Sequence, residues 1–368
     1  MPIMQHAASS NWRPIPAIVV GTGFGCKVHV PALRAAGLEV AALVGTDGER
    51  LARSAEESRV PRTFTDLDQA VKETGALVVA VSTPPNTHAP LVLQAIERGC
   101  HVLCEKPMAL NAQEAQAMLN AAEVAGVMHV IGHEHRWEPD RVLMGRAIAD
   151  GLIGAPRFLT FIRYIPFVAD PSASGMARLP RWWFDKEAGG GWLGASGSHM
   201  IDQIRAWLGE FDSLSAALPI VSDRKDVAED SLVVRFRLKN GLEGVLQETA
   251  GAWGPRTELW RIAGTKGTIW SENGLVRLAS VAGVAELPVP EDAMLPTAPA
   301  RGVAESSSRA PQVGVYTRLY EALRAGIEGR EIKSAVPLPT FRDGVAHMRV
   351  MDAIRGSANK RGALVQVE

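Results

Sequence analysis

The sequence has few of the features that mark secreted, membrane-bound or nucleic-acid-binding proteins. It contains three cysteines in 368 residues (Cys26, Cys100 and Cys104), too few for a disulfide framework and typical of a reducing compartment. No apolar run is long enough to span a bilayer, and the first 14 residues lack a basic-then-apolar secretion signal. With 39 basic and 40 acidic side chains the formal net charge is -1, and no basic block is interleaved with aromatic residues. We therefore expect a cytoplasmic protein that binds a small molecule, and neither nucleic acid nor a membrane.

The length exceeds what one compact core usually carries, so two domains are expected. Strand and helix patterns alternate six times as far as residue 131, which favours a doubly wound parallel sheet. We predict a tail at 1–14, a dinucleotide-binding Rossmann domain at 15–137, and an α+β domain with an open-faced, mainly antiparallel sheet at 138–368. Within the second domain, the proline-, serine- and alanine-rich region 283–312 is predicted to be a mobile loop or arm.

A glycine-rich turn follows the first predicted strand, Ala17–Val20. It reads Gly21-Thr-Gly23-Phe-Gly25-Cys26 and leads into a helix that ends near Gly37. Glycine at the first two key positions allows a tight turn and a close approach of backbone N–H groups to a pyrophosphate. Cys26 occupies the last key position, where glycine or alanine is usual. Looser packing of the helix against the strand is therefore expected there.

The choice of dinucleotide is open at the end of the second predicted strand, Val40–Val44. Asp47 follows Thr46 and lies near the position where an acid would hold a ribose 2′-hydroxyl, but it can equally cap the next helix. Arg50, one turn further on, could instead meet a 2′-phosphate. Both NAD and NADP are compatible with this segment.

Two further strands run into polar loops at the same expected edge of the sheet. Leu77–Ser82 leads into the rigid loop Thr83-Pro-Pro-Asn-Thr-His88, and His101–Cys104 leads into Glu105-Lys106-Pro107. Open parallel sheets bind their ligands at the carboxyl ends of the strands. We therefore expect the function to depend on Lys106, although an isolated Glu-Lys-Pro is more often a solvated turn.

The apolar period changes to two in the second half. Segments 158–164 and 232–238 alternate as half-exposed strands do, and Lys239-Asn-Gly-Leu242 predicts a hairpin. Consecutive hairpins favour an antiparallel sheet. An open apolar face on that sheet would meet a second subunit, so we expect a homo-oligomer, a dimer or a tetramer.

A second chemical element lies in the glycine-rich run 189–202, which contains His199. This histidine falls on the first turn of a predicted helix, whose positive end favours the neutral imidazole of a general base. A lone histidine is nevertheless more often held by local hydrogen bonds. The aromatic residues before the glycines can fill a core or stack on a sugar ring. The predicted substrate contacts are Arg136, Tyr164, Trp182, Trp183 and Asp202.

His133, Glu134 and His135 leave the last parallel strand and raise the question of a metal site. Alternate residues leaving a strand point to opposite sides, so the three side chains need not converge. No fourth ligand with suitable spacing is present in the sequence. We therefore predict a substrate-facing polar strip and no metal.

With the glycine turn, the Ser82–His88 loop and Cys104-Glu-Lys-Pro107 in this order, the chain resembles the Gfo/Idh/MocA oxidoreductases over nearly its whole length. This is the family of glucose–fructose oxidoreductase and inositol 2-dehydrogenase. The resemblance implies a nicotinamide cofactor in the cleft between the two domains, a catalytic Lys106, and a second catalytic group in the stretch of His199. Together with the strand-end residues above, the predicted cofactor contacts are Gly21, Gly23, Phe24, Gly25, Thr46, Asp47, Arg50, Ser82, Thr83, Pro84, Asn86, His88, Glu105 and Lys106.

The sequence departs from the family at Ala195, because many members carry an aspartate four residues before the histidine. Asp202 cannot reproduce that geometry, so either His199 works alone with Lys106 or the chemistry is modified. We expect an NAD(P)-dependent oxidoreductase that acts on a CH–OH group of a sugar, polyol or related cyclic alcohol, with Lys106 and His199 handling the substrate oxygen. The alternatives are a related lyase or glycosidase that uses transient oxidation by bound NAD, and a non-catalytic nucleotide-binding protein.

Overall fold

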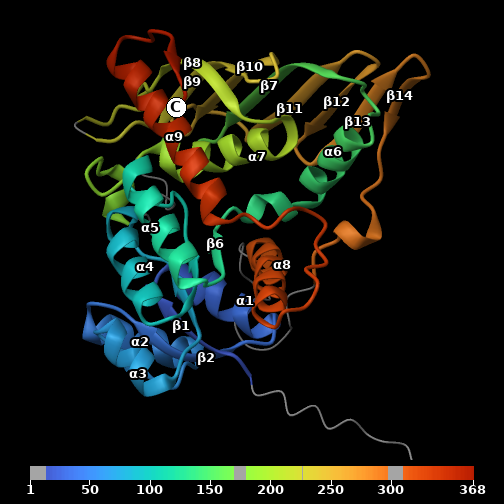
Figure 1. Ribbon diagram of the computed structural model, residues 1–368. Coiled ribbons are helices and arrows are strands. Elements are labelled where there is room, and N and C mark those ends of the chain that lie inside the picture. The colour runs from blue at the N-terminus through green and yellow to red at the C-terminus, as the bar shows by residue number, and fades with distance from the viewer. Residues whose placement is uncertain (1–13, 170–179, 226, 297–309) are drawn as a thin grey trace, which may run out of the picture.

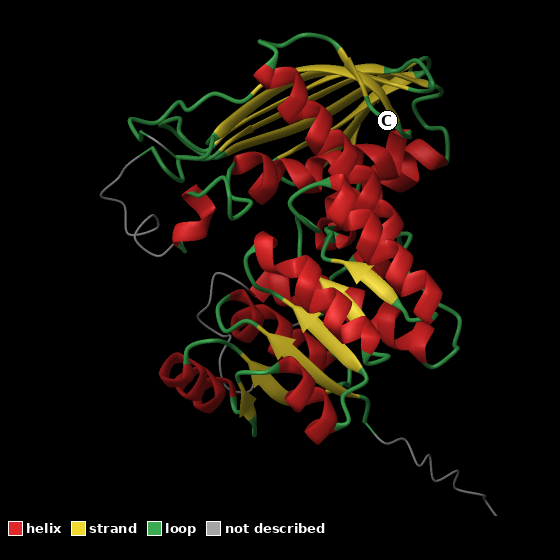
Figure 2. Ribbon diagram, turned by 60° about the vertical axis from the view of Figure 1, so that its left-hand side comes forward, coloured by secondary structure: helices red, strands yellow, loops and turns green. Residues whose placement is uncertain are grey.

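The computed structural model describes residues 14–169, 180–225, 227–296 and 310–368. They form two β-sheets with helices between and around them (Figures 1 and 2). The first sheet has six parallel strands, in the order β3 (Thr63–Phe64), β2 (Glu39–Val44), β1 (Pro16–Val20), β4 (Val78–Val81), β5 (His101–Cys104) and β6 (His129–Ile131).

The second sheet has nine strands, and among its described pairs β7 and β10 are parallel while the others are antiparallel. Together the two sheets confirm the predicted fold class. The strand order is β14 (Gly283–Glu286), β13 (Leu275–Ser280), β12 (Gly267–Glu272), β11 (Thr257–Gly264), β7 (Pro156–Tyr164), β10 (Glu243–Thr249), β9 (Ser231–Leu238), β8 (Phe211–Ala217) and β15 (Val365–Gln366).

Two separate apolar cores cover the two faces of the first sheet. In β1, Ile18 and Val20 belong to one core, and Ala17 and Val19 to the other. Burial on both faces explains why these strands are apolar throughout. The first core includes α3 (Leu67–Thr74), α4 (His88–Glu97) and α5 (Ala112–Ala125), and the second includes α1 (Val30–Ala35), α2 (Gly48–Ser58) and α8 (Ala310–Ile327).

The end of the chain returns to the first sheet. Helix α8 packs against α1 and completes the second core. Just before α9 (Phe341–Asn359), the Pro339 carbonyl accepts a hydrogen bond of 3.0 Å from the Ile131 N–H at the end of β6. The predicted boundary at residues 137/138 separates two segments of the sequence, but α8 from the second segment packs in the core of the first sheet.

The predicted arm at 283–312 is wrong at its two ends. Gly283–Glu286 pairs with β13 as an edge strand, and α8 begins at Ala310. The amino-acid composition predicted a loop in these two places because small and polar residues are also common in edge strands and in the first turns of helices. Residues 297–309 lie outside the described part of the chain, as do 1–13 of the predicted tail.

The second sheet is covered on one face and open on the other. Helices α6 (Pro139–Ala149), α7 (Ser198–Leu208) and α9 lie between it and the first sheet (Figure 1). The opposite face carries partly exposed apolar side chains, such as Phe158 at 45% and Val233 at 46% exposure. No helix in the described ranges is long and apolar enough to cross a bilayer.

The strand order β3-β2-β1-β4-β5-β6 places a crevice at the carboxyl ends of β1 and β4. β1 and β4 are neighbours in the sheet, but the helices that follow them lie on opposite faces. The loop after β1 and the loop after β4 therefore diverge and leave a crevice between them. The glycine turn follows β1 and the Thr83 loop follows β4. The fold therefore brings the first two predicted motifs together.

The glycine turn yields a test that separates packing from nucleotide binding. A Cβ on Gly25 would lie 2.8 Å from Val19 Cγ1, whereas one on Gly23 would meet only Arg50 Nη2, at 3.6 Å. The close contact between the helix and the strand is therefore made at Gly25, while the looser packing expected at Cys26 stays a prediction. We expect Gly25→Ala to lower the free energy of unfolding by about 1–3 kcal/mol.

The matched control is Gly23→Ala, which should leave the unfolding midpoint nearly unchanged but weaken nucleotide binding. Thermal unfolding and a nucleotide titration of both variants measure the two effects. Equal midpoints for the two variants would contradict the assignment of the close contact to Gly25.

Candidate active site

The glycine turn is shaped to take a ligand against its backbone. Gly21 has φ +108°, and a Cβ there would lie 2.3 Å from the Ser82 carbonyl oxygen. Only glycine tolerates both conditions. Beside Gly23 the space is open apart from the Arg50 guanidinium. These residues fit the pyrophosphate of a dinucleotide, for which such a turn leaves backbone N–H groups accessible.

Asp47 caps α2, and this does not decide the dinucleotide. One of its carboxylate oxygens accepts a hydrogen bond from the Arg50 N–H at 3.0 Å. Thr46, Asp47 and Arg50 are all exposed beside the turn. The cap is therefore observed, while a ribose or phosphate contact stays a prediction.

His88 stabilises the loop that follows β4 through contacts with two backbone carbonyls. Its ring is fully buried, with Nε2 2.9 Å from the Thr83 carbonyl oxygen and Nδ1 3.0 Å from the Pro107 carbonyl oxygen. Burial lowers the pKa of His88, so the neutral ring donates to one of these carbonyls at a time. Thr83, Pro84 and Asn86 are partly or fully exposed at the crevice. His88 ties this loop to the turn that carries Lys106.

Glu105 faces a buried polar network that the sequence did not reveal. Its Oε1 accepts hydrogen bonds from His29 Nε2, at 3.1 Å, and from the Tyr316 hydroxyl of α8. His29 also lies 2.6 Å from the Tyr320 hydroxyl through Nδ1. Burial raises the pKa of Glu105, but these hydrogen bonds and the charges of His29 and Lys106 outweigh it and hold the pKa below its usual value. The rings of His29 and Tyr316 both pack edge-on against Phe24.

Lys106 lies at the carboxyl end of β5 and reaches across to the second half of the chain. Its Nζ donates a hydrogen bond to the Ala195 carbonyl oxygen at 2.8 Å, and the Lys106–Pro107 peptide is cis. Burial lowers the pKa of this amine, partly offset by the charges of Glu105 and Glu134. Since an ammonium has three donors, Lys106 keeps capacity for a substrate oxygen.

His199 meets Glu134 and His135 next to Lys106. Its Nδ1 lies 3.7 Å from Glu134 Oε2, and its ring stacks on His135 with centroids 3.9 Å apart and planes 9° from parallel. Burial lowers the pKa of His199 well below its ordinary value, and the neighbouring His135 and Lys106 lower it further. Burial raises the pKa of Glu134 to about 8, with Glu105 adding to the effect.

The expectation that the side chains of residues 133–135 need not converge therefore fails for Glu134 and His135, which both approach His199. Residues Glu134–Trp137 form a 3₁₀ turn rather than extended chain, so alternation across a strand does not apply. His133 Nε2 lies 3.2 Å from His347 Nδ1, and its ring also packs edge-on against that of His199, with centroids 5.8 Å apart. The convergence of the other two with His199 depends on this turn.

Glu134, His135 and His199 each offer a potential metal ligand, and these atoms lie within 4.8 Å of one another. The ring geometry does not suit a shared ion. An imidazole binds a metal at about 2.0 Å through a lone pair in the ring plane. The rings of His135 and His199 are nearly parallel, with centroids 3.9 Å apart, so their lone pairs lie in two stacked planes that do not converge on one ion. The arrangement favours stacked neutral rings.

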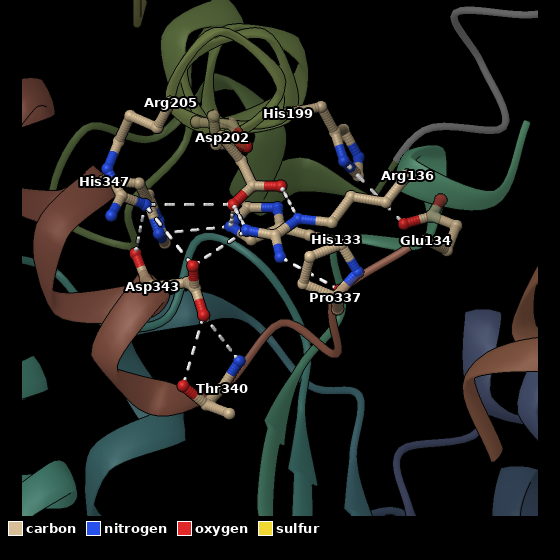
Figure 3. A network of polar contacts seen from close by, with 12 residues as sticks. His133, Glu134, Arg136, His199, Asp202, Arg205, Pro337, Thr340, Asp343 and His347 are labelled. Carbon is tan, nitrogen blue, oxygen red and sulfur yellow. Dashed lines mark hydrogen bonds and ion pairs between the residues drawn. The ribbon is translucent and has the colours of Figure 1, made fainter. Parts of the chain in front are cut away.

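Arg136 and Asp202 hold each other rather than an open substrate position. Two guanidinium nitrogens donate to the two Asp202 oxygens at 2.6 and 2.7 Å, and a third contact of 2.9 Å joins Arg136 to Asp343 of α9 (Figure 3). Arg136 is 3% and Asp202 1% exposed. Their predicted role as substrate contacts is not supported by this geometry.

Tyr164 was the wrong choice on β7. Leu159 and Phe161 face the core, so Arg163 follows them on the inner face, and Tyr164 points to the outer face, where its hydroxyl accepts from Gln247 at 2.8 Å. Arg163 instead donates to the Ser196 hydroxyl at 2.9 Å. The sequence did contain a signal for Arg163, because alternation along the strand places this charged residue on the buried face.

Two carboxylates on the inner face complete the surroundings of the site, and sequence reasoning missed both. Glu248 of β10 accepts from the Ser196 hydroxyl, and burial raises its pKa to about 7. Glu258 of β11 contacts Arg141 and Arg163. Burial opposes ionisation of Glu258, but these two guanidinium groups hold its pKa at about 2.

Trp182 and Trp183 lie in a 3₁₀ turn, Arg181–Phe184, and are partly buried. The Trp183 ring is 6.0 Å from that of Phe167, which is equally far from Trp192. Trp183 therefore packs against the core, and a stacking role on substrate remains a prediction for Trp182.

Comparison with known proteins places this chain in a family. Residues 15–133 match the family described as "Oxidoreductase family, NAD-binding Rossmann fold", and residues 142–270 match the "GFO/IDH/MocA C-terminal domain". The chain belongs to the Gfo/Idh/MocA oxidoreductase family. Membership in the family confirms the predicted class of enzyme and the nicotinamide dinucleotide as its cofactor.

Individual members of the family are similar along most of the chain. A 1,5-anhydro-D-fructose reductase from Ensifer adhaerens is 30% identical over 270 residues, which are 71% of this chain and 78% of that protein. A levoglucosan dehydrogenase from Pseudarthrobacter phenanthrenivorans is 28% identical over 345 residues, 85% of each chain. A solved structure of a levoglucosan dehydrogenase with NADH and levoglucosan has a TM-score of 0.83 at 23% identity and covers 97% of this chain and 100% of its own.

The buried ion pair predicts a large effect of one substitution on stability. Asp202→Asn removes the charge of the bidentate, fully buried partner of Arg136 and leaves Asp343 as its remaining carboxylate; breaking a buried ion pair costs about 3–5 kcal/mol. We expect the free energy of unfolding in urea to fall by about that amount. The control is Glu210→Gln, whose carboxylate pairs with Arg205 but is 50% exposed, and it should cost less than about 1 kcal/mol. Similar losses for both variants would contradict the importance of the buried pair.

Proposed function

We propose that the chain is an NAD(P)-dependent dehydrogenase or reductase of a secondary alcohol or ketone in a sugar, polyol or related cyclic alcohol. The observation that carries the proposal is the grouping of the Lys106 amine with His199 and Glu134 at the carboxyl end of β5. This is the edge of the sheet where the glycine turn and the Thr83 loop also end. A donor and a base beside a nucleotide-shaped crevice suit carbonyl–alcohol chemistry.

The cofactor contacts inferred from the sequence belong to this proposal. Gly21, Gly23 and Gly25 fit the pyrophosphate, and the exposed Thr46, Asp47 and Arg50 fit the adenosine ribose or its 2′-phosphate. When bound, the nicotinamide supplies hydride chemistry at the substrate carbon. Family membership leaves NAD and NADP as alternatives.

Lys106 and His199 have separate tasks at the substrate oxygen. Lys106 donates a hydrogen bond to this oxygen and stabilises negative charge as it develops. In the oxidation direction, the neutral His199 accepts the hydroxyl proton, which its lowered pKa permits near neutral pH. In the reduction direction the same nitrogen returns a proton.

The substrate class rests on the relatives and on the polar lining. Named relatives include the anhydrofructose reductase, the levoglucosan dehydrogenase and a D-apiose dehydrogenase. Arg163 and Glu248, on the inner face of the second sheet, offer a donor and an acceptor for further hydroxyl groups. A polyhydroxylated neutral ring suits such a mixture.

The open face of the second sheet would be covered by a second copy of the chain. Its exposed Phe158 and Val233 favour burial in a dimer or tetramer. Light scattering during gel filtration measures the molar mass, and a mass of one chain at micromolar concentration would contradict this assembly.

Two measurements test the proposed activity. Tryptophan fluorescence, followed during titration of nucleotide-free protein with NADH and then NADPH, should show binding of at least one. A panel of sugars and polyols with the preferred nucleotide should then reveal turnover. Failure of folded protein to bind either nucleotide would overturn the proposal.

Lys106→Met should remove charge stabilisation at the substrate oxygen. We expect kcat to fall by about 10²–10³-fold while nucleotide affinity is retained within a few fold. Lys333→Met, at an exposed surface lysine in an ion pair with Glu331, is the control and should keep full activity. Near-normal turnover in Lys106→Met would contradict its catalytic role.

A further inference from the structure

Two buried polar atoms face each other in the site without a hydrogen bond. Glu134 Oε2 and His199 Nδ1 lie 3.7 Å apart, and neither has a hydrogen-bond partner. Glu134 is 3% and His199 4% exposed. Buried polar groups are almost always paired, so an unpaired carboxyl oxygen and an unpaired imidazole nitrogen side by side indicate a working pair that closes during the reaction. Figure 3 shows the carboxyl directed at the ring.

No other acid among the described residues is placed to serve His199. Ala195, one turn earlier in the chain, contributes its carbonyl to Lys106 and has no carboxylate. Asp202 is engaged by Arg136, and Glu248 accepts from Ser196. Glu134 comes from a different segment, the 3₁₀ turn after β6. It approaches the histidine from the side of the first sheet.

We propose that Glu134 is the positioning residue of His199: it selects the tautomer of the imidazole and receives the proton that the imidazole takes from substrate. This inference rests on the proposed dehydrogenase function. It assigns to Glu134 the task that Ala195 cannot perform.

The proton steps balance as a relay. In the oxidation direction the substrate O–H bond breaks and its proton goes to His199 Nε2, while the Nδ1 proton goes to Glu134 Oε2. The substrate oxygen keeps the electron pair of the O–H bond and forms the carbonyl as the carbon loses hydride to the oxidised nicotinamide. His199 ends neutral with its proton on Nε2, and Glu134 ends protonated. Reduction runs the same transfers backwards.

Charged and titratable groups surround the pair on several elements, and the balance between them sets the pH range. Burial raises the pKa of Glu134 to about 8, and burial lowers that of His199. Added protons therefore go to the carboxyl. The groups that act on the pair are Glu105 and Lys106 after β5, His133, His135 and Glu138 near the 3₁₀ turn, Arg163 on β7 and Tyr316 on α8.

The direction of the pH dependence follows from the relay. Oxidation needs an ionised Glu134 to receive the proton, so its rate should rise as pH increases through about 8 and then level off. Reduction needs the protonated form, so its rate should fall over the same range. In Glu134→Gln, the change of rate with pH near 8 should be absent from both profiles. We expect kcat of this variant to fall about 10²-fold at the optimum, with nucleotide affinity unchanged.

Rescue distinguishes a positioning role from a merely structural one. Glu134→Gln combined with Ala195→Asp supplies a carboxylate from the helix side and should recover at least tenfold in kcat over Glu134→Gln alone. The matched control is Glu123→Gln, a surface acid of α5 that pairs with Arg342 outside the site. It should keep the pH profile of the parent. A pH dependence near 8 that persists in Glu134→Gln, or that is lost in Glu123→Gln, would overturn the proposal.

A second readout does not depend on activity. In nucleotide-free protein with ¹⁵N-labelled histidine, the His199 signals are assigned with a His199→Asn variant and followed with pH. We expect the ring proton to move from Nε2 to Nδ1 as pH rises through about 8, because Glu134 then changes from donor to acceptor. Glu134→Gln should show no such change. If no alcohol is oxidised, the proposed function fails, and this titration still decides the role of Glu134.

The same protein tests the competing metal interpretation. Zn²⁺ titrated into wild type and Glu134→Gln should bind both equally weakly and leave wild-type activity without gain. A stoichiometric, Glu134-dependent gain in activity on adding Zn²⁺ would overturn the proposal.

Discussion

The position of His199 near Lys106 depends on the buried ion pair between Arg136 and Asp202. Arg136 follows the first sheet, Asp202 lies one turn beyond His199 on α7, and Asp343 on α9 binds the same guanidinium. Three segments far apart in the sequence are thereby held at one point. Because a buried charge cannot be left unpaired without a large loss of stability, the orientation of α7 relative to β5 has little freedom. The pairing of catalytic groups from the two halves of the chain follows from this constraint.

Four carboxyl groups share one poorly hydrated region, and their neighbours separate their proton affinities. His29, Tyr316 and Lys106 hold Glu105 ionised, and Arg141 and Arg163 do the same for Glu258. Glu134 and Glu248 lack an equally close cation, so burial raises the pKa of each, to about 8 and about 7. The first two acids maintain structure, while the second two are able to exchange protons near neutral pH. Such division of roles by environment is a common means of running acid and base chemistry in one site.

Local patterns predicted the parts of the site that one segment forms alone. The glycine turn, the end of β5 and the first turn of α7 are each determined by their own residues, so Gly21, Lys106 and His199 were found in the sequence. The missed residues depend on geometry between segments. Glu134 reaches His199 because a 3₁₀ turn replaces an extended chain, and Arg163 rather than Tyr164 faces inward because of strand register. Arg136 and Asp202 looked like substrate contacts because the sequence does not show that each satisfies the other.

The packing of α8 on the first sheet has a consequence for how the chain folds during synthesis. Tyr316 and Tyr320 of α8 pack in the second core with residues of this sheet and of α1. The Tyr316 hydroxyl also donates a hydrogen bond to Glu105, and the Tyr320 hydroxyl contacts His29. The ribosome makes these residues nearly two hundred positions after β6 (316 − 131 = 185). Until then the second core, which α1 and α2 also cover, lacks the side chains of α8, and the Glu105 carboxylate lacks one of its hydrogen-bond donors. The core of the nucleotide-binding half is therefore completed only after most of the chain has been synthesised.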